Sequence, residues 1–79
     1  MKIKLSDLFD NFVLITSMHS NNRNDLSDNE KMFTKKLEYD IITKLKDKRI
    51  SLDNYAKLLR LQRLVHEINC WNKVGVYRR

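Results

Sequence analysis

Two stretches with a helical spacing of apolar residues, joined by a very short connection, constrain the fold of this chain more than any other feature. The first covers about residues 28–48 and the second about residues 52–72, with a turn at Lys48-Arg49-Ile50. A connection this short forces consecutive helices to lie side by side and to run antiparallel. The sequence therefore predicts a helical hairpin.

The first of these helices has a clear beginning. Ser27 and Glu30 form a capping-box pattern, in which the serine oxygen accepts a backbone N–H and the glutamate reaches back to the capping residue. Apolar side chains then recur every four residues, which fits one face of a helix and not the two-residue alternation of a strand. This predicted core face consists of Phe33, Leu37, Ile41 and Leu45, flanked by Met32 and Ile42.

The second helix is expected to begin at Ser51 or Asp53, since both residue types are common N-caps. Its predicted core face consists of Leu58, Leu61, Val65 and Ile68, widened by Leu52, Tyr55, Leu59, Leu64 and Trp71. Residues 51–61 faintly resemble the first half of a helix-turn-helix motif. Arg60, however, stands where that motif usually has the glycine of its turn, so a continuous helix is the favoured interpretation.

The N-terminal part predicts a third helix over about residues 6–18. Its apolar residues are Leu5, Leu8, Phe9, Phe12, Val13, Ile15 and Met18. Steps of three and four dominate, although the β-branched run at 13–16 keeps a strand as the alternative. A polar loop over residues 19–25 follows. We thus expect one all-α domain over residues 1–79, a small three-helix fold built on the hairpin, with a short basic C-terminal tail.

Composition agrees with a helical chain, since there is one glycine and no proline. A 79-residue chain buries a limited core, and the single cysteine, Cys70, rules out an internal disulfide. A homodimer would be one way to complete such a core. Neither a signal peptide nor a membrane-spanning segment is evident, because charged and polar residues interrupt the first apolar run. We predict a cytoplasmic protein.

Positive charge is concentrated in the second part of the chain. The net charge is +6, but residues 1–30 sum to −2 and residues 31–79 to +8. A positive field of this kind favours an anionic partner, either nucleic acid or an acidic protein surface.

Two basic groups are candidates for contacting such a partner. The first is Lys44, Lys46, Lys48 and Arg49 at the end of the first hairpin helix, where cations also suit the helix dipole without any ligand. The second is Lys57, Arg60 and Arg63 on one side of the last helix, together with Arg78 and Arg79 of the tail. The plain alternative for the second group is an ordinary polar face, with Glu67 paired to Arg63 four residues earlier.

Other chemistry finds little support in the sequence. Trp71 and Tyr77 are candidate interface aromatics. A tryptophan at the end of an apolar stripe more often covers the core, so Tyr77, beyond the predicted helix, is the better candidate. His66 and Cys70 lie one helical turn apart, but a zinc site needs about two more ligands. A packed histidine and a buried thiol are therefore expected there. We predict no enzyme, no catalytic residues, no metal or other cofactor and no small-molecule substrate.

Two functions remain from these observations. The first is a small basic regulatory protein that binds nucleic acid or a transcription assembly through the basic residues named above. The second is a protein-binding adaptor or inhibitor, which would use an apolar groove beside the last helix with basic residues at its rim.

Overall fold

The computed structural model describes residues 3–72, and in that range the chain forms four α-helices: α1 (Leu5–Phe9), α2 (Phe12–Ser20), α3 (Asp28–Leu45) and α4 (Leu52–Trp71). The all-α prediction is confirmed. No helix within residues 3–72 is both long and apolar enough to cross a bilayer. The predicted basic tail, with Tyr77, Arg78 and Arg79, lies outside the described residues.

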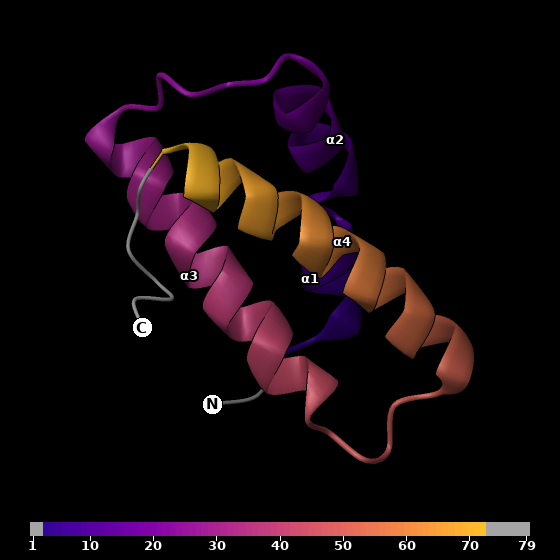
Figure 1. Ribbon diagram of the computed structural model, residues 1–79. Coiled ribbons are helices and arrows are strands. Elements are labelled where there is room, and N and C mark those ends of the chain that lie inside the picture. The colour runs from indigo at the N-terminus through magenta and orange to yellow at the C-terminus, as the bar shows by residue number, and fades with distance from the viewer. Residues whose placement is uncertain (1–2, 73–79) are drawn as a thin grey trace.

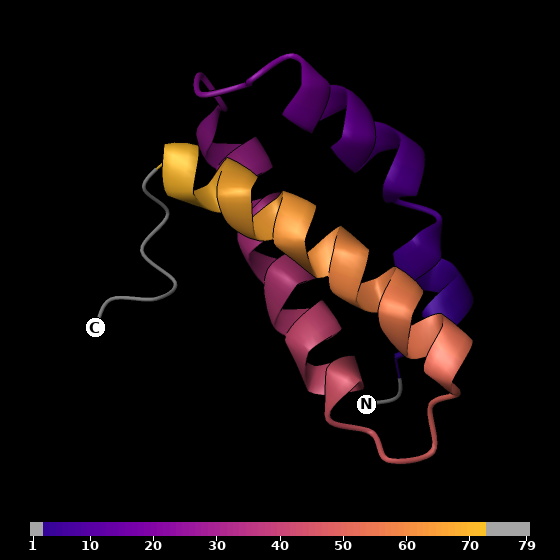
Figure 2. The same ribbon diagram turned by 45° about the vertical axis from the view of Figure 1, so that its right-hand side comes forward.

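The predicted hairpin is formed by α3 and α4, which run antiparallel and side by side in both views (Figures 1 and 2). Helix α3 ends at Leu45, about one turn earlier than predicted. The connection is then closed by Asp47, whose Oδ1 accepts the backbone N–H of Arg49 at 2.9 Å and whose carbonyl accepts that of Ile50 at 3.3 Å. These two bonds make a tight turn of the kind that aligns neighbouring helices.

Both hairpin helices begin as predicted. Ser27 Oγ accepts the backbone N–H of Glu30 at 3.2 Å, and Glu30 Oε1 accepts that of Ser27 at 2.9 Å, completing the capping box. This backbone hydrogen bond lowers the pKa of Glu30 below its ordinary value. The bond therefore stabilises the helix start above that ordinary pKa and is lost as the pH falls through the lowered one. Ser51 caps α4 by accepting the N–H of Asn54 at 3.2 Å.

The segment that contains α1 and α2, called the N-terminal arm below, differs from the prediction of one continuous helix over 6–18. It is broken at Asp10 and Asn11 into α1 and α2. The Asn11 side chain explains the break, because its Nδ2 donates to the carbonyls of Asp7 at 3.1 Å and Leu8 at 3.3 Å and so satisfies the last turn of α1. Of the apolar residues of the predicted helix, Val13 is 82% exposed on α2, whereas Ile15 and Met18 are buried.

The core lies where α4 packs against α3 on one side and α2 on the other, while α1 packs against α3 (Figure 2). Its buried hydrophobic residues are Leu8, Ile15, Met18, Leu26, Leu37, Ile41, Leu58, Leu61, Val65 and Ile68. The four residues that define the core face of α4 are thus confirmed. The flanking residues Leu52, Tyr55 and Leu59 are exposed instead, since they lie on the side of α4 away from its neighbours.

The predicted core face of α3 is wrong at one of its four residues, since Leu45 is partly buried and packs against the core. Leu37 and Ile41 are buried, but Phe33 is exposed and Thr34 is buried beside Leu37 in its place. Helical geometry explains the error, because a four-residue step advances about 400° and the stripe rotates by about 40° at each step. Met32 lies still farther from the core and is largely exposed.

Asn72 fastens the loop between α2 and α3 to the end of α4. Its Nδ2 donates to the carbonyl of Arg23 at 3.0 Å, and its Oδ1 accepts the backbone N–H of Leu26 at 3.1 Å. The same Nδ2 lies 2.8 Å from the carbonyl of Ile68. One buried amide thus satisfies backbone groups from both segments, which places the start of α3 against the end of α4.

Replacing Asn72 with alanine is expected to lower the free energy of unfolding by about 2 kcal/mol, because it removes the side-chain partners of the buried Leu26 N–H and of the half-buried Arg23 carbonyl. Urea unfolding followed by circular dichroism measures the loss. Asn24→Ala, in the exposed part of the same loop, is the matched control and should change stability by less than about 0.5 kcal/mol. Equal stability of the two variants would contradict this role for Asn72.

Candidate functional site

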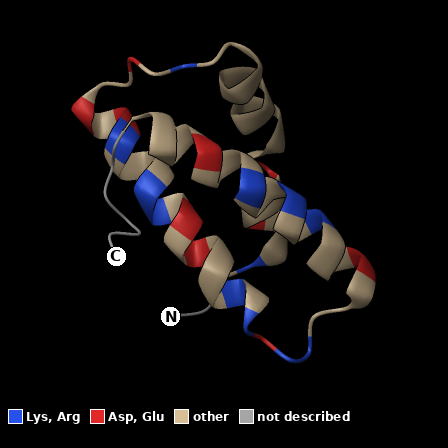
Figure 3. Ribbon diagram, viewed as in Figure 1, with Lys and Arg blue, Asp and Glu red and all other residues tan. Residues whose placement is uncertain are grey.

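The basic residues predicted on the last helix are all exposed. Lys57, Arg60 and Arg63 lie on α4 at three-residue spacing, and Figure 3 shows basic positions in blue along this helix. Within residues 3–72, none of the three forms an ion pair with a carboxylate. Lys57 lies nearest the N-terminal arm, with its Nζ 4.9 Å from the ring centroid of Phe9. This set is called the α4 basic face below.

The expected pairing of Glu67 with Arg63 does not form. Glu67 Oε1 instead lies 2.5 Å from Nε2 of His19, at the end of α2. The His19 ring also stacks on Trp71, with ring centroids 4.9 Å apart. Trp71 is half-buried and packs against the core, so it closes the contact between α2 and α4. Glu67, the acidic residue four positions after Arg63, is therefore engaged elsewhere, whereas Asp53 lies four positions before Lys57 in the first turn of α4.

The basic group at the end of α3 is partly neutralised. Asp47 lies 3.6 Å from Nζ of Lys44 and 3.4 Å from Nε of Arg49, so one carboxylate faces two of the four cations. The backbone N–H of Arg49, followed by the Arg49 side chain, lowers the pKa of Asp47 and keeps it ionised at neutral pH. Lys46 and Lys48 are exposed. Two of the four cations in this group therefore already contact a carboxylate.

A shallow hollow lies between the N-terminal arm and α4. It is lined by Phe9, Phe12, Ala56, Lys57 and Arg60, so its floor is apolar and two cations stand at its rim. The two phenylalanine rings pack together with centroids 6.3 Å apart. An apolar surface beside α4 with a basic rim is the kind of feature expected for the adaptor hypothesis, and it adjoins the α4 basic face.

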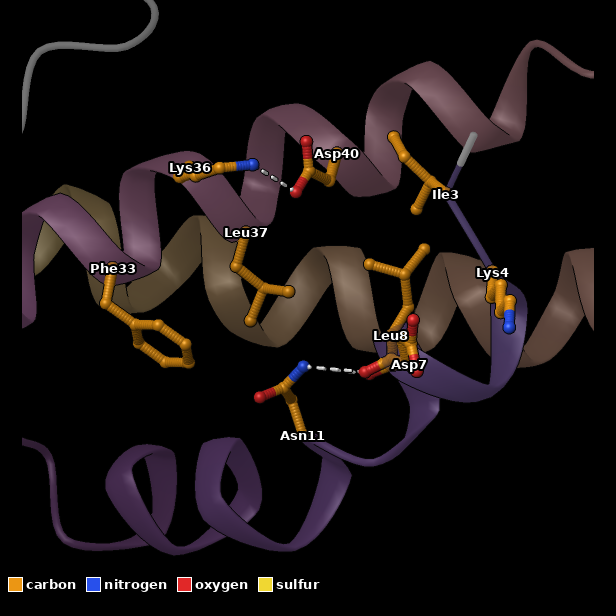
Figure 4. Close-up of a pocket in the computed structure, with 9 residues that line it drawn as sticks. All are labelled: Ile3, Lys4, Asp7, Leu8, Asn11, Phe33, Lys36, Leu37 and Asp40. Carbon is orange, nitrogen blue, oxygen red and sulfur yellow. Dashed lines mark hydrogen bonds and ion pairs between the residues drawn. The ribbon is translucent and has the colours of Figure 1, made fainter. Parts of the chain in front are cut away.

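A second hollow, between α1 and α3, has balanced charge. Phe33 and Leu37 point from α3 toward Leu8 and Asn11, as Figure 4 shows. Its rim carries two lysines and two aspartates, and Lys36 Nζ is tied to Asp40 Oδ2 at 2.8 Å. Such a rim has no preference for an anion over a cation, so we assign no site here.

A buried polar cluster joins α3 to α4. The Glu38 side chain is fully buried at their interface, where Asn69 Nδ2 donates to its Oε1 at 2.6 Å. Gln62 Nε2 lies 3.2 Å and His66 Nδ1 lies 3.1 Å from its Oε2. A buried carboxylate requires such donors, because burial removes its water. The cluster fixes how the two helices face each other.

The cluster extends to the surface through the cysteine. His66 is half-buried, and its second nitrogen, Nε2, lies 3.6 Å from Sγ of Cys70. Cys70 is exposed, so the prediction of a buried thiol is wrong. The next residue, Asn69, takes the inward position on this turn of α4. The protein thus has a solvent-accessible thiol against an imidazole that is itself held by a buried carboxylate.

The sequence held a signal for this cluster that the search for motifs missed. Gln62, His66 and Asn69 recur at steps of four and three residues, directly beside the apolar stripe of α4. Glu38 likewise follows Thr34 by four residues, beside the stripe of α3. Two matching polar rows at the edge of two facing apolar stripes indicate polar contacts across the helix pair.

Comparison with known proteins gives no family for this chain. No protein-family model, curated protein sequence or solved structure matches it.

Proposed function

We propose that the protein is a small basic binding protein that contacts nucleic acid through the α4 basic face. The observation that supports this proposal is the row of three exposed cations on one rigid helix, with the nearby Glu67 bonded to His19. Cations held on a helix suit the regularly spaced phosphates of a nucleic-acid backbone. We also propose Lys46 and Lys48 as secondary contacts, whereas Lys44 and Arg49 share Asp47.

Contacts of this type make sequence-tolerant complexes. Backbone phosphates are common to all sequences, so the proposed binding is sensitive to salt and weakly selective for bases. A role as a regulator acting on nucleic acid or a transcription assembly, in the cytoplasm and without catalysis, fits such binding. Arg78, Arg79 and Tyr77 would add to the contact, although they lie outside the described residues.

Reversing charge on the α4 basic face tests the proposal. In Arg60→Glu/Arg63→Glu, affinity for duplex DNA should fall by about tenfold or more at low salt, because two phosphate contacts become repulsive. Fluorescence anisotropy with a labelled duplex measures it. The matched control Lys4→Glu/Lys35→Glu changes the net charge equally at two exposed lysines on other surfaces. Equal losses in both variants would mean that net charge alone matters and would contradict this face.

A protein-binding adaptor is the second candidate, and a separate observation favours it. Leu52, Tyr55 and Leu59 form an exposed apolar row on α4, with Leu52 81% and Leu59 45% exposed. Rows at this spacing are typical of surfaces that take a partner helix. Light scattering tests whether this row mediates self-association. A native dimer that becomes a monomer in Leu52→Ser/Leu59→Ser would support a protein interface here. A monomeric native protein and a monomeric variant would exclude a homodimer.

A further inference from the structure

The arrangement of Cys70, His66 and Glu38 carries an inference separate from nucleic-acid binding. Three different groups from two helices form a continuous chain of contacts, from an exposed thiol through an imidazole to a fully buried carboxylate. A nucleophile within reach of a base, with the base oriented by a third group, is the geometry that activates thiols. We propose that Cys70 is a reactive thiol that undergoes exchange with small disulfides.

The buried carboxylate determines which His66 nitrogen faces the thiol as an acceptor. In the proposed arrangement Glu38 acts as a carboxylate that only accepts hydrogen bonds, and the Nδ1 that lies 3.1 Å from its Oε2 carries the proton. The other nitrogen, Nε2, then presents a lone pair toward Cys70 Sγ, at 3.6 Å. Asn69 and Gln62 hold the carboxylate in place from α4, so the imidazole is oriented by a structure that is already formed.

The step balances as a thiol–disulfide exchange. The Cys70 S–H proton passes to His66 Nε2, and the sulfur attacks one sulfur of a low-molecular-weight disulfide. A new S–S bond forms to Cys70 while the original S–S bond breaks, and the departing sulfur takes the proton from His66. Cys70 is oxidised to a mixed disulfide and the departing half is reduced to a thiol. The disulfide itself is the oxidant, and since Cys70 is the only cysteine in the chain, the product persists until an external thiol removes it.

The rate of reaction with the disulfide 2,2′-dithiodipyridine tests the proposal. The reaction releases thiopyridone, which is measured by absorbance. The disulfide is uncharged, so the positive charge of the protein does not attract or repel it. The control Cys70→Ser/Ser17→Cys moves the thiol to an exposed helical position whose preceding turn offers Val13 instead of an imidazole. We expect the native protein to react about tenfold faster than this control, or more, as general-base assistance implies. Equal rates would overturn the proposal.

A second variant isolates the imidazole. His66→Gln retains an N–H that can donate to Glu38 but offers no base to the thiol, so its rate should fall to that of the relocated thiol. Circular dichroism verifies that the variant is folded. An unchanged rate in the folded variant would overturn the role of His66, and the native-to-relocated comparison decides the proposal even where His66→Gln does not fold.

Glu38 acts through His66 and is therefore a positioning residue. Nitrogen-15 NMR of the His66 ring should report the Nδ1–H tautomer in the native protein and its loss in Glu38→Gln, together with a slower exchange reaction. The same tautomer and rate in both proteins would contradict the positioning role. A purely structural carboxylate would leave the ring signals of a folded variant unchanged.

Discussion

Replacing Leu58 with aspartate is expected to unfold the protein at room temperature. The Leu58 side chain is 0% exposed in the core that α4 forms with its neighbours. Loss of a buried leucine alone lowers the free energy of unfolding by about 2–5 kcal/mol. The introduced carboxylate would have to be buried without a partner, at a further several kcal/mol. A chain of this length has about 4–12 kcal/mol of stability in total, so the sum approaches or exceeds all of it.

The adjacent residue provides the matched control for this prediction. Leu59 belongs to the same turn of α4 but is 45% exposed. Leu59→Asp introduces the same charge on the same helix and should lower the free energy of unfolding by less than about 1 kcal/mol. Thermal unfolding followed by circular dichroism distinguishes the two variants. Similar melting curves for both would contradict the placement of α4 in the core.

Glu38→Ala is expected to produce the second large loss, about 3 kcal/mol or more in the free energy of unfolding. The carboxylate accepts from Asn69 and Gln62 and contacts His66, so its removal takes away their shared acceptor and opens a cavity between α3 and α4. Urea unfolding gives the size of the effect.

A second acidic residue on α3 controls for general effects of charge removal. Asp40 pairs with the exposed side chain of Lys36 at 2.8 Å, and its own side chain retains some contact with solvent. Asp40→Ala should therefore cost about 1 kcal/mol or less. If Glu38→Ala were no more destabilising than Asp40→Ala, the buried cluster would not hold the hairpin together.

The sequence predicted most of the fold because its signals were local. The capping box at Ser27 and Glu30, the cap at Ser51 and the core face of α4 each depend on residues within a turn or two. The break of the N-terminal arm depends on one side chain, Asn11, bonding back to its own helix, which no apolar spacing reveals. The wrong assignment of Phe33 to the core face of α3 has a different origin, since the four-residue spacing does not include the rotation of the stripe.

Some features of the candidate sites follow from local sequence and others depend on the packed structure. The exposure of Arg60 and Arg63 follows from their position away from the α4 core face, and helical spacing predicted it; Lys57 lies at the edge of that face, beside Phe9. The contact of Asp47 with both Lys44 and Arg49 depends on the geometry of a turn. The contact of Glu38 with His66 joins residues 28 positions apart, and the contact of His19 with Glu67 joins residues 48 apart. Pairing across helices requires the packed structure, so local patterns could not specify it.

Binding of the native protein to heparin and to duplex DNA at two salt concentrations tests the proposed function most directly. Three phosphate contacts from the α4 basic face predict that the logarithm of the binding constant falls with the logarithm of the salt concentration, with a slope of about −3 or steeper. Arg60→Gln/Arg63→Gln should reduce the magnitude of that slope by about 2. No binding by the native protein even at low salt would contradict the proposed function. The positive charge would then be a solvated surface that makes no contact with nucleic acid.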